Sequence, residues 1–419
     1  MPISSMKGEA LALTAVEEPP SASCNSISYG FASDNSSKGE DHHAAITSDP
    51  RKAAFGVFDG HSGGGAAWLC ADKLLAKLDV CGMDPESITS AFWELDDEVG
   101  VVGIDRSGTT ATVLLVEEDD VDGGMRCLLA WAGDSTALRF DIANTSAFQG
   151  IVARPTVDHS PTQPAEVAFL QRLSSVRVGV EQRGEPLAEA VALALGGRDP
   201  SPSERKLFER ALRRAERIST TLRTSGSSGC DGTAGDGEDG ATLPLDATVL
   251  GRERAAAVRN AYVIQRPPRS ASSNRWKRRP TVVATALQHE NPVYYDVAMT
   301  RSIGDWHGPD MVVPHPQLEA FSVPAAKRTR VILASDGLWD VCEHESAVRL
   351  ARECASPQEA AEALLTFAQR EYAARGKKGV GDDVTIYVVD LNPSGLSFRP
   401  PAKSAYSHCC SGVHWCPVQ

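Results

Sequence analysis

Acidic residues at the ends of strand-like runs are the feature that most limits what this chain can fold into. Residues 53–58 form an apolar run too short for a helix; it ends at Asp59, and glycines then turn the chain toward a helical pattern. Two more strand-like runs end just before Asp134 and Asp336, and a fourth begins just after Asp382. Strand ends can hold polar groups rigidly toward a cleft. One such turn could equally be an exposed loop, but four are hard to explain by chance.

A fifth acidic position is the pair Glu40 and Asp41, which precedes the apolar residues 44–46. On a strand the two side chains would project to opposite sides, so one could touch a metal directly and the other could act through water. The pair by itself is also compatible with a solvated acidic turn. Carboxylates gathered in one cleft repel each other by several kcal/mol, which bound cations would relieve. Ligation by oxygen alone favours Mg²⁺ or Mn²⁺ over Zn²⁺.

Composition excludes some classes of partner. The 419 residues include 42 Lys and Arg against 55 Asp and Glu, a formal charge of −13. This balance argues against a general nucleic-acid or membrane-surface protein, and we expect neither partner. The 10 cysteines are scattered without a C-x-x-C pair, and we recognise no signal peptide or membrane span. These features predict an intracellular protein, in the cytoplasm, the nucleus or both.

Periodicity predicts the main elements. Apolar spacing indicates helices around residues 66–78 and 88–99, and further helices over 343–353 and after a capping box that begins at Ser356. Residues 107–116 and 126–132 are typical of two strands joined by a glycine turn. The sequence therefore predicts a mixed domain with an antiparallel hairpin at its centre.

The chain contains six short motifs: Phe55–His61 (FGVFDGH), Ser107–Ala111 (SGTTA), Ala130–Ser135 (AWAGDS), Thr300–Asp305 (TRSIGD), Leu333–Asp340 (LASDGLWD) and Gly381–Thr385 (GDDVT). In this order they resemble the motifs of the metal-dependent type 2C Ser/Thr protein phosphatases. So many ordered motifs make the resemblance highly specific, and it runs from about residue 29 to 391 with one large interruption.

The resemblance implies an α+β fold, a four-layer α-β-β-α sandwich. Two antiparallel sheets would pack face to face with helices outside, and metals would lie at one end of the sandwich. We expect a catalytic domain over residues 25–392, interrupted by a basic, partly helical and partly disordered insert at about 165–285. Residues 1–24 are interpreted as a disordered leader and 393–419 as a tail.

The resemblance also implies metal ligands. Asp59 would bridge two metal ions, Mg²⁺ or Mn²⁺. The carbonyl of Gly60 and the carboxylate of Glu40 would complete the shell of the second ion, and Asp336 and Asp382 would hold the first.

The remaining roles follow from the same resemblance. Asp41 would act through water, and Asp134 would contribute to a weaker third metal site. His61 matches the general acid of the family. The implied reaction is hydrolysis of phosphoserine and phosphothreonine in protein substrates by direct attack of a metal-bridging hydroxide. We expect a monomer.

Some positions depart from the family pattern. Ser36 stands where relatives usually carry a phosphate-binding Arg, and Lys38 could supply positive charge there only as a point charge. Arg301 is the second predicted substrate-binding residue. Asp383 stands where Asn is usual and could tighten a metal or simply face solvent. The loss of the Arg leaves open an alternative, a weak or inactive phosphoprotein-binding pseudophosphatase.

The insert has a charge of its own. Residues 201–280 hold 16 Lys and Arg against 9 Asp and Glu, so this piece carries +7 and the remainder −20. A capping box at 201–204 predicts a helix, and residues 225–240 have the composition of a linker. The basic charges could bind acidic or phosphorylated partners or direct nuclear import, or they could simply be solvated on a tolerated loop. We favour the solvated loop.

Overall fold

The computed structural model describes residues 27–102, 107–120, 123–142, 154–225, 262–264, 281–288, 291–306 and 312–392. The predicted leader, the tail and the 225–240 linker lie outside these ranges, apart from Ser225. No helix in the described ranges is both long and apolar enough to span a bilayer.

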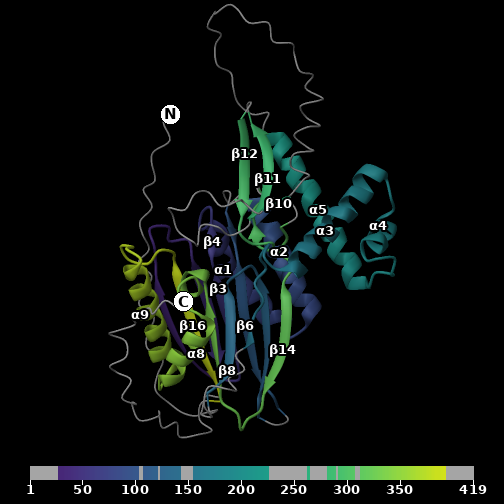
Figure 1. Cartoon of the computed structure of the whole chain (residues 1–419). Helices are drawn as coiled ribbons and strands as arrows, with labels where there is room; N and C mark the ends of the chain where they lie inside the picture. The colour runs from purple at the N-terminus through teal and green to yellow at the C-terminus, as the bar shows by residue number, and fades with distance from the viewer. Residues whose placement is uncertain are drawn as a thin grey trace, which may run out of the picture.

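Two five-stranded antiparallel sheets form the centre of the protein (Figure 1). The first has the order β14-β7-β6-β3-β2 and contains β2 (His42–Asp49), β3 (Lys52–Phe58), β6 (Ala111–Glu118), β7 (Met125–Ala132) and β14 (Gln317–Val323). The second has the order β1-β16-β15-β8-β9 and contains β1 (Ile27–Asp34), β8 (Thr136–Asp141), β9 (Arg154–Pro155), β15 (Thr329–Ala334) and β16 (Val384–Leu391). The predicted hairpin is confirmed as the pair β6 and β7.

Alternating side chains of the central strands enter different cores. In β3, Phe55 and Val57 point between the two sheets, where they join Val389 of the second sheet in one cluster. Ala54 and Phe58 of the same strand face the helices on the outside. Because successive side chains of a strand point to opposite faces, a strand buried on both faces has a continuous apolar run.

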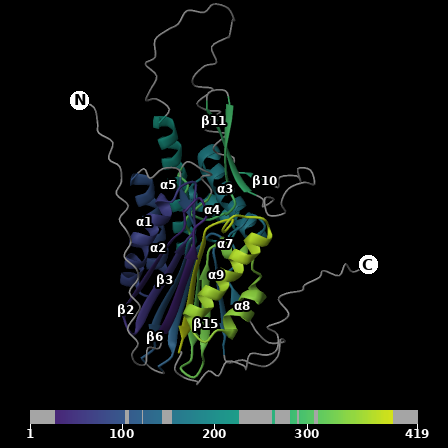
Figure 2. The same ribbon diagram turned by 90° about the vertical axis from the view of Figure 1, so that its left-hand side faces the viewer.

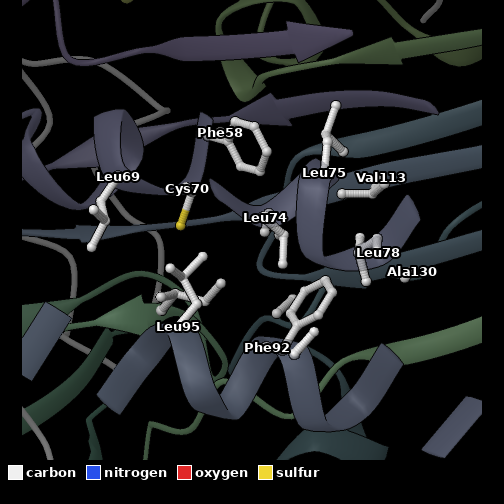
Figure 3. Close-up of a cluster of buried hydrophobic side chains, with 14 of the residues drawn as sticks. Phe58, Leu69, Cys70, Leu74, Leu75, Leu78, Phe92, Leu95, Val113 and Ala130 are labelled. Carbon is white, nitrogen blue, oxygen red and sulfur yellow. The ribbon is translucent and has the colours of Figure 1, made fainter. Parts of the chain in front are cut away.

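Helices cover the outer faces of both sheets. The first sheet packs on α1 (Gly65–Cys81) and α2 (Pro85–Val102) through a cluster that includes Leu74, Phe92 and Val113 (Figure 3). The second packs on α7 (Asp336–Trp339), α8 (His344–Glu353) and α9 (Pro357–Ala374) (Figure 2). Ser356 caps α9 as predicted, since its side chain accepts a hydrogen bond from the backbone of Glu359. The predicted helices and the four-layer α+β sandwich are confirmed.

A group of helices lies beside the sandwich, at the α2 side (Figure 1). It consists of α3 (Pro164–Arg183), α4 (Leu187–Ala194) and α5 (Pro202–Ser225). These helices share an apolar cluster with Trp93 of α2. The capping box predicted at the start of α5 is present: the Ser201 backbone donates to Glu204 Oε2 at 2.9 Å. A separate sheet, β10-β11-β12, contains β10 (Tyr262–Ile264), β11 (Thr281–Gln288) and β12 (Asn291–Val297).

A small third sheet connects three motifs that are distant in sequence. It has the order β13-β5-β4 and contains β4 (Gly60–His61), β5 (Gly108–Thr109) and β13 (Ile303–Gly304). Gly108 is paired with His61 on one side and with Gly304 on the other. These pairings bring residue 305 beside residue 61 although 244 positions separate them.

Candidate active site

The acidic residues singled out in the sequence lie at one end of the sandwich. Asp59 follows β3, whose last residue, Phe58, pairs with His42 at the start of β2, so Glu40 and Asp41 stand at the same end. In the second sheet, Ala334 at the end of β15 pairs with Thr136 at the start of β8, which places Asp336 and Asp134 together at that end. The two sheets meet there, because the backbone N–H of Asp336 donates to Asp59 Oδ2 at 3.4 Å.

This grouping changes the acidity of the central carboxylates. Burial, together with the neighbouring charges of Asp336, Asp41 and Asp134, raises the pKa of Asp59 well above its ordinary value. Burial also raises the pKa of Asp41 to about 7, although hydrogen bonds from Ser335 and Thr385 lower it in part. The Asp41 Oδ2 atom is buried and has no hydrogen-bond partner among the described residues. A buried carboxylate oxygen without a donor is a position that a hard cation would stabilise.

The predicted ligands are not all directed to one point. Glu40 Oε1 accepts a hydrogen bond from the backbone of Gly63 at 2.7 Å, and Asp382 binds the Lys38 ammonium at 2.9 and 3.0 Å. Within the described residues, no three His, Cys, Asp or Glu side chains are grouped as ligands of one metal ion. The oxygen donors fit Mg²⁺ or Mn²⁺ chemically, but Asp382 would have to exchange its ammonium partner for the metal.

Asp383 organises the loop that carries Glu40 and Asp41. Its buried carboxylate accepts backbone hydrogen bonds from Ser36 and Glu40 at 2.5 Å, from Asp41 at 3.2 Å and from Gly39 at 3.3 Å. Although burial alone would raise its pKa, these hydrogen bonds lower it below the ordinary value. The expectation that Asp383 faces solvent was therefore wrong, because its carboxylate is buried against the backbone. Its influence on a metal stays a prediction.

His61 forms an ion pair with Asp305. Its Nε2 lies 2.8 Å from Asp305 Oδ1 and 3.0 Å from Oδ2, while its Nδ1 is buried and has no hydrogen-bond partner in the described part of the chain. Burial lowers the pKa of His61, but the Asp305 carboxylate outweighs this effect, so the pKa is raised above its ordinary value. The nearly buried carboxylate of Asp305 thus favours the protonated form of the imidazole.

The backbone shapes this pair closely. Asp305 has a positive φ of 56°, a conformation that Asp tolerates better than most residues. Its N–H donates to the carbonyl of Ser107 at 3.1 Å. Gly108 lies under the pair, and a Cβ there would come within 2.4 Å of His61 Nε2. The glycine of the SGTTA motif is therefore required for the imidazole and the carboxylate to meet.

Arg301, which was predicted to bind substrate, is paired with a buried carboxylate. Its guanidinium binds Glu166 of α3 through Nη2 to Oε1 at 2.7 Å and through Nε to Oε2 at 2.9 Å, and it donates to the His315 carbonyl at 3.0 Å. The Arg301 and Glu166 side chains are only 11% and 7% exposed. The guanidinium is already paired with a buried carboxylate and so anchors α3, and its predicted contact with substrate phosphate stays a prediction.

A family model described as Protein phosphatase 2C matches residues 28–196 and 280–375 of the chain. The chain belongs to the protein phosphatase 2C family. Residues 197–279, between the two matched segments, contain all of α5 and begin later than the predicted insert.

Individual members of the protein phosphatase 2C family resemble the chain over shorter lengths. Protein phosphatase 2C 50 of Oryza sativa is 39% identical over 117 residues, which cover 23% of this chain and 29% of that protein. Protein phosphatase 2C homolog 1 of Schizosaccharomyces pombe is 33% identical over 112 residues, covering 26% and 30%. The matched segment thus spans less than a third of these relatives.

One solved structure resembles the whole fold. The crystal structure of serine-threonine phosphatase 2C from Toxoplasma gondii has a TM-score of 0.51 and 14% sequence identity, covering 87% of this chain and 94% of that one. At this identity the likeness concerns the protein phosphatase 2C fold alone.

Two residues of this protein phosphatase 2C site were not selected from the sequence. Asp305 stands in the TRSIGD motif, two residues after the start of β13, and an acidic residue in a motif was a signal that could have found it. Glu166 lies in α3 without a motif, and no local pattern distinguishes it.

Proposed function

We propose that the protein is a divalent-metal-dependent protein serine/threonine phosphatase. The observation that carries the proposal is the juxtaposition of two unlike groups. Asp59 lies in the field of four further carboxylates, Asp336, Asp41, Asp134 and Asp382, and His61 lies two residues along the chain, paired with Asp305. A carboxylate cluster that attracts cations, beside a positioned acid, suits hydrolysis of a phosphate monoester.

The metal-holding residues are proposed to be Asp59, Asp336 and Asp382, with Glu40 and the Gly60 carbonyl. Asp41 would act through water, and Asp134 would belong to a weaker third site. When bound, Mg²⁺ or Mn²⁺ would neutralise phosphate charge and lower the pKa of a water molecule that attacks phosphorus. The unpartnered Asp41 oxygen and the raised pKa of Asp59 support this assignment, since both are relieved by a cation.

His61 is proposed to donate a proton to the leaving oxygen of phosphoserine or phosphothreonine. An alkoxide is a poor leaving group, so proton donation lowers the barrier, by about 10²–10⁴ in rate for a well-placed acid. Asp305 raises the pKa of the imidazole, which favours its protonated form, and fixes its orientation through Nε2. Nδ1 is buried and lacks a partner among the described residues, so it is the nitrogen that would have to become accessible when substrate binds.

Lys38 is the proposed contact for the substrate phosphate. Its side chain is 53% exposed and its ammonium is already at the site, paired with Asp382. Release of Lys38 by a metal on Asp382 would leave the ammonium available to an anion. The lack of an Arg at position 36 also favours a second candidate, a phosphoprotein-binding pseudophosphatase without turnover.

One experiment separates the candidates. The full chain is incubated with p-nitrophenyl phosphate and with a phosphothreonine peptide, each with Mn²⁺ and with EDTA, and Asp59→Asn serves as the inactive control. Turnover of both substrates that requires Mn²⁺ and Asp59 is the expected result. Binding of the phosphopeptide without turnover of either substrate would support the pseudophosphatase and refute the enzyme.

A further inference from the structure

The helix α5 comes from the part of the chain that the family model leaves unmatched, yet it contacts the active-site motifs. It runs parallel to α2, and four of its basic residues meet α2 in register. Lys206 binds Glu86, Arg210 donates to Ser90, Arg214 binds Asp96 and Arg217 binds Asp97. The interpretation of the whole insert as solvated charge is therefore wrong for α5.

Arg214 differs from the other basic residues of α5 in its burial. Its side chain is 2% exposed and that of Asp96 is 1%, whereas Arg217 and Asp97 are 44% and 55% exposed. Arg214 Nε donates to Asp96 Oδ2 at 2.8 Å, and Nη2 also reaches the carbonyl of Gly304. The guanidinium lies 5.3 Å from the centroid of the Trp306 ring. Its planar fork thus binds two acceptors at once.

These contacts enclose the segment that carries Asp305. Asp96 Oδ1 accepts a hydrogen bond from the Gly304 N–H at 2.8 Å, and the Asp96 carbonyl accepts one from Trp306 Nε1 at 2.9 Å. Gly304 has a positive φ of 95°. Both polar groups of Gly304 are therefore bound by the Arg214–Asp96 pair, directly before Asp305.

Resting on the phosphatase function proposed above, we propose that Arg214 is a positioning residue that holds the Gly304–Asp305 turn against His61. The arrangement makes α5 part of the catalytic unit. The carbonyl of Gly304, in the TRSIGD motif, accepts a hydrogen bond from a helix that lies outside the segments matched by the family model. Loss of the guanidinium would leave Asp96 buried without a cation and free the Gly304 carbonyl, so Asp305 would lose its fixed orientation.

The test compares Arg214→Met with Arg217→Met, a control on the same helix whose ion pair is exposed. p-Nitrophenolate leaves readily without a proton, whereas the alkoxide of phosphothreonine requires one. We expect Arg214→Met to lower kcat for the phosphothreonine peptide roughly tenfold to a hundredfold, with KM little changed, and to lower kcat for p-nitrophenyl phosphate much less. Arg217→Met should leave both values within about twofold of the wild type.

A double-mutant cycle with His61→Ala then asks whether the effect passes through the imidazole. In that background Arg214→Met should cause no further loss on the peptide, because the acid it positions is already absent. Equal losses on both substrates, or the same loss with and without His61, would overturn the proposal in favour of a purely structural role. If Arg214→Met does not fold, Arg214→Lys, which keeps the charge but not the fork, replaces it in the comparison.

A readout without turnover separates this proposal from the proposed function. In protein labelled with ¹⁵N-histidine, the His61 imidazole signals are identified by their loss in His61→Ala. They should shift in Arg214→Met and remain in place in Arg217→Met. Unmoved signals in Arg214→Met would refute the positioning role, whereas an inactive wild type with shifted signals would refute only the phosphatase function.

Discussion

Replacing Gly108 by Ala should break the contact between His61 and Asp305. A Cβ at Gly108 would lie 2.3 Å from Asp305 Oδ2 and 2.4 Å from His61 Nε2. Each atom would have to retreat by about 1 Å to reach ordinary contact distance. Their hydrogen bonds are 2.8 and 3.0 Å long, so both cannot survive such a displacement. The backbone of Gly108 has no positive φ, so the side chain alone causes the effect.

The size of the loss follows from the chemistry of the leaving group. A displacement of about 1 Å can cost about 10²-fold in rate, within the range of about 10²–10⁴ for losing a general acid. We expect kcat for a phosphothreonine peptide to fall about 10²-fold in Gly108→Ala. The kcat for p-nitrophenyl phosphate should fall less than about tenfold, since its leaving group needs little protonation.

The control is Gly64→Ala, at the start of α1. A Cβ there would lie 3.5 Å from its nearest neighbour, His42 Nε2, which is ordinary contact. This variant should keep the ratio of the two rates and lose at most about 1 kcal/mol of stability at the helix N-cap. Steady-state kinetics with both substrates measure the ratio, and thermal melting confirms folding. A Gly108→Ala enzyme with an unchanged ratio would refute the role given to the pair.

Three further outcomes are expected. In metal-free protein the raised pKa of Asp41 means that the folded state retains a proton that the unfolded chain releases, so stability falls as pH rises from about 4 to about 7; Mn²⁺ should therefore raise Tm more at pH 7.5 than at pH 5, and equal shifts would contradict this. Arg330→Met should lower the free energy of unfolding in urea by about 2–4 kcal/mol, because the buried Asp390 loses its closer partner and keeps only Arg328, 3.6 Å away; a loss below about 1 kcal/mol would contradict it. Ser36→Arg should lower KM for the phosphopeptide severalfold without raising kcat, and an unchanged KM would show that position 36 does not contact phosphate.

The sequence patterns by themselves predicted the main strands and helices, and the family resemblance of the motifs implied the four layers and the end of the sandwich where the site lies. Apolar runs such as residues 53–58 and the helical spacing of residues 66–78 are local patterns, and burial of both faces follows from them. The position of Asp59 at a strand end was also local. A carboxylate that directly follows such a run must lie at the end of its strand, whatever the rest of the chain does.

Only the tertiary structure decided which charged groups meet. Asp305 pairs with His61, and Glu166 pairs with Arg301, across long stretches of chain. Asp383 likewise accepts hydrogen bonds from the distant backbone at 36–41. A guanidinium or carboxylate has the same local pattern whether it is solvated or buried, so the sequence could not distinguish Arg214 from Arg217. Desolvation and the distance to an opposite charge depend on the packing of α5 on α2, and these two quantities determine what each group does.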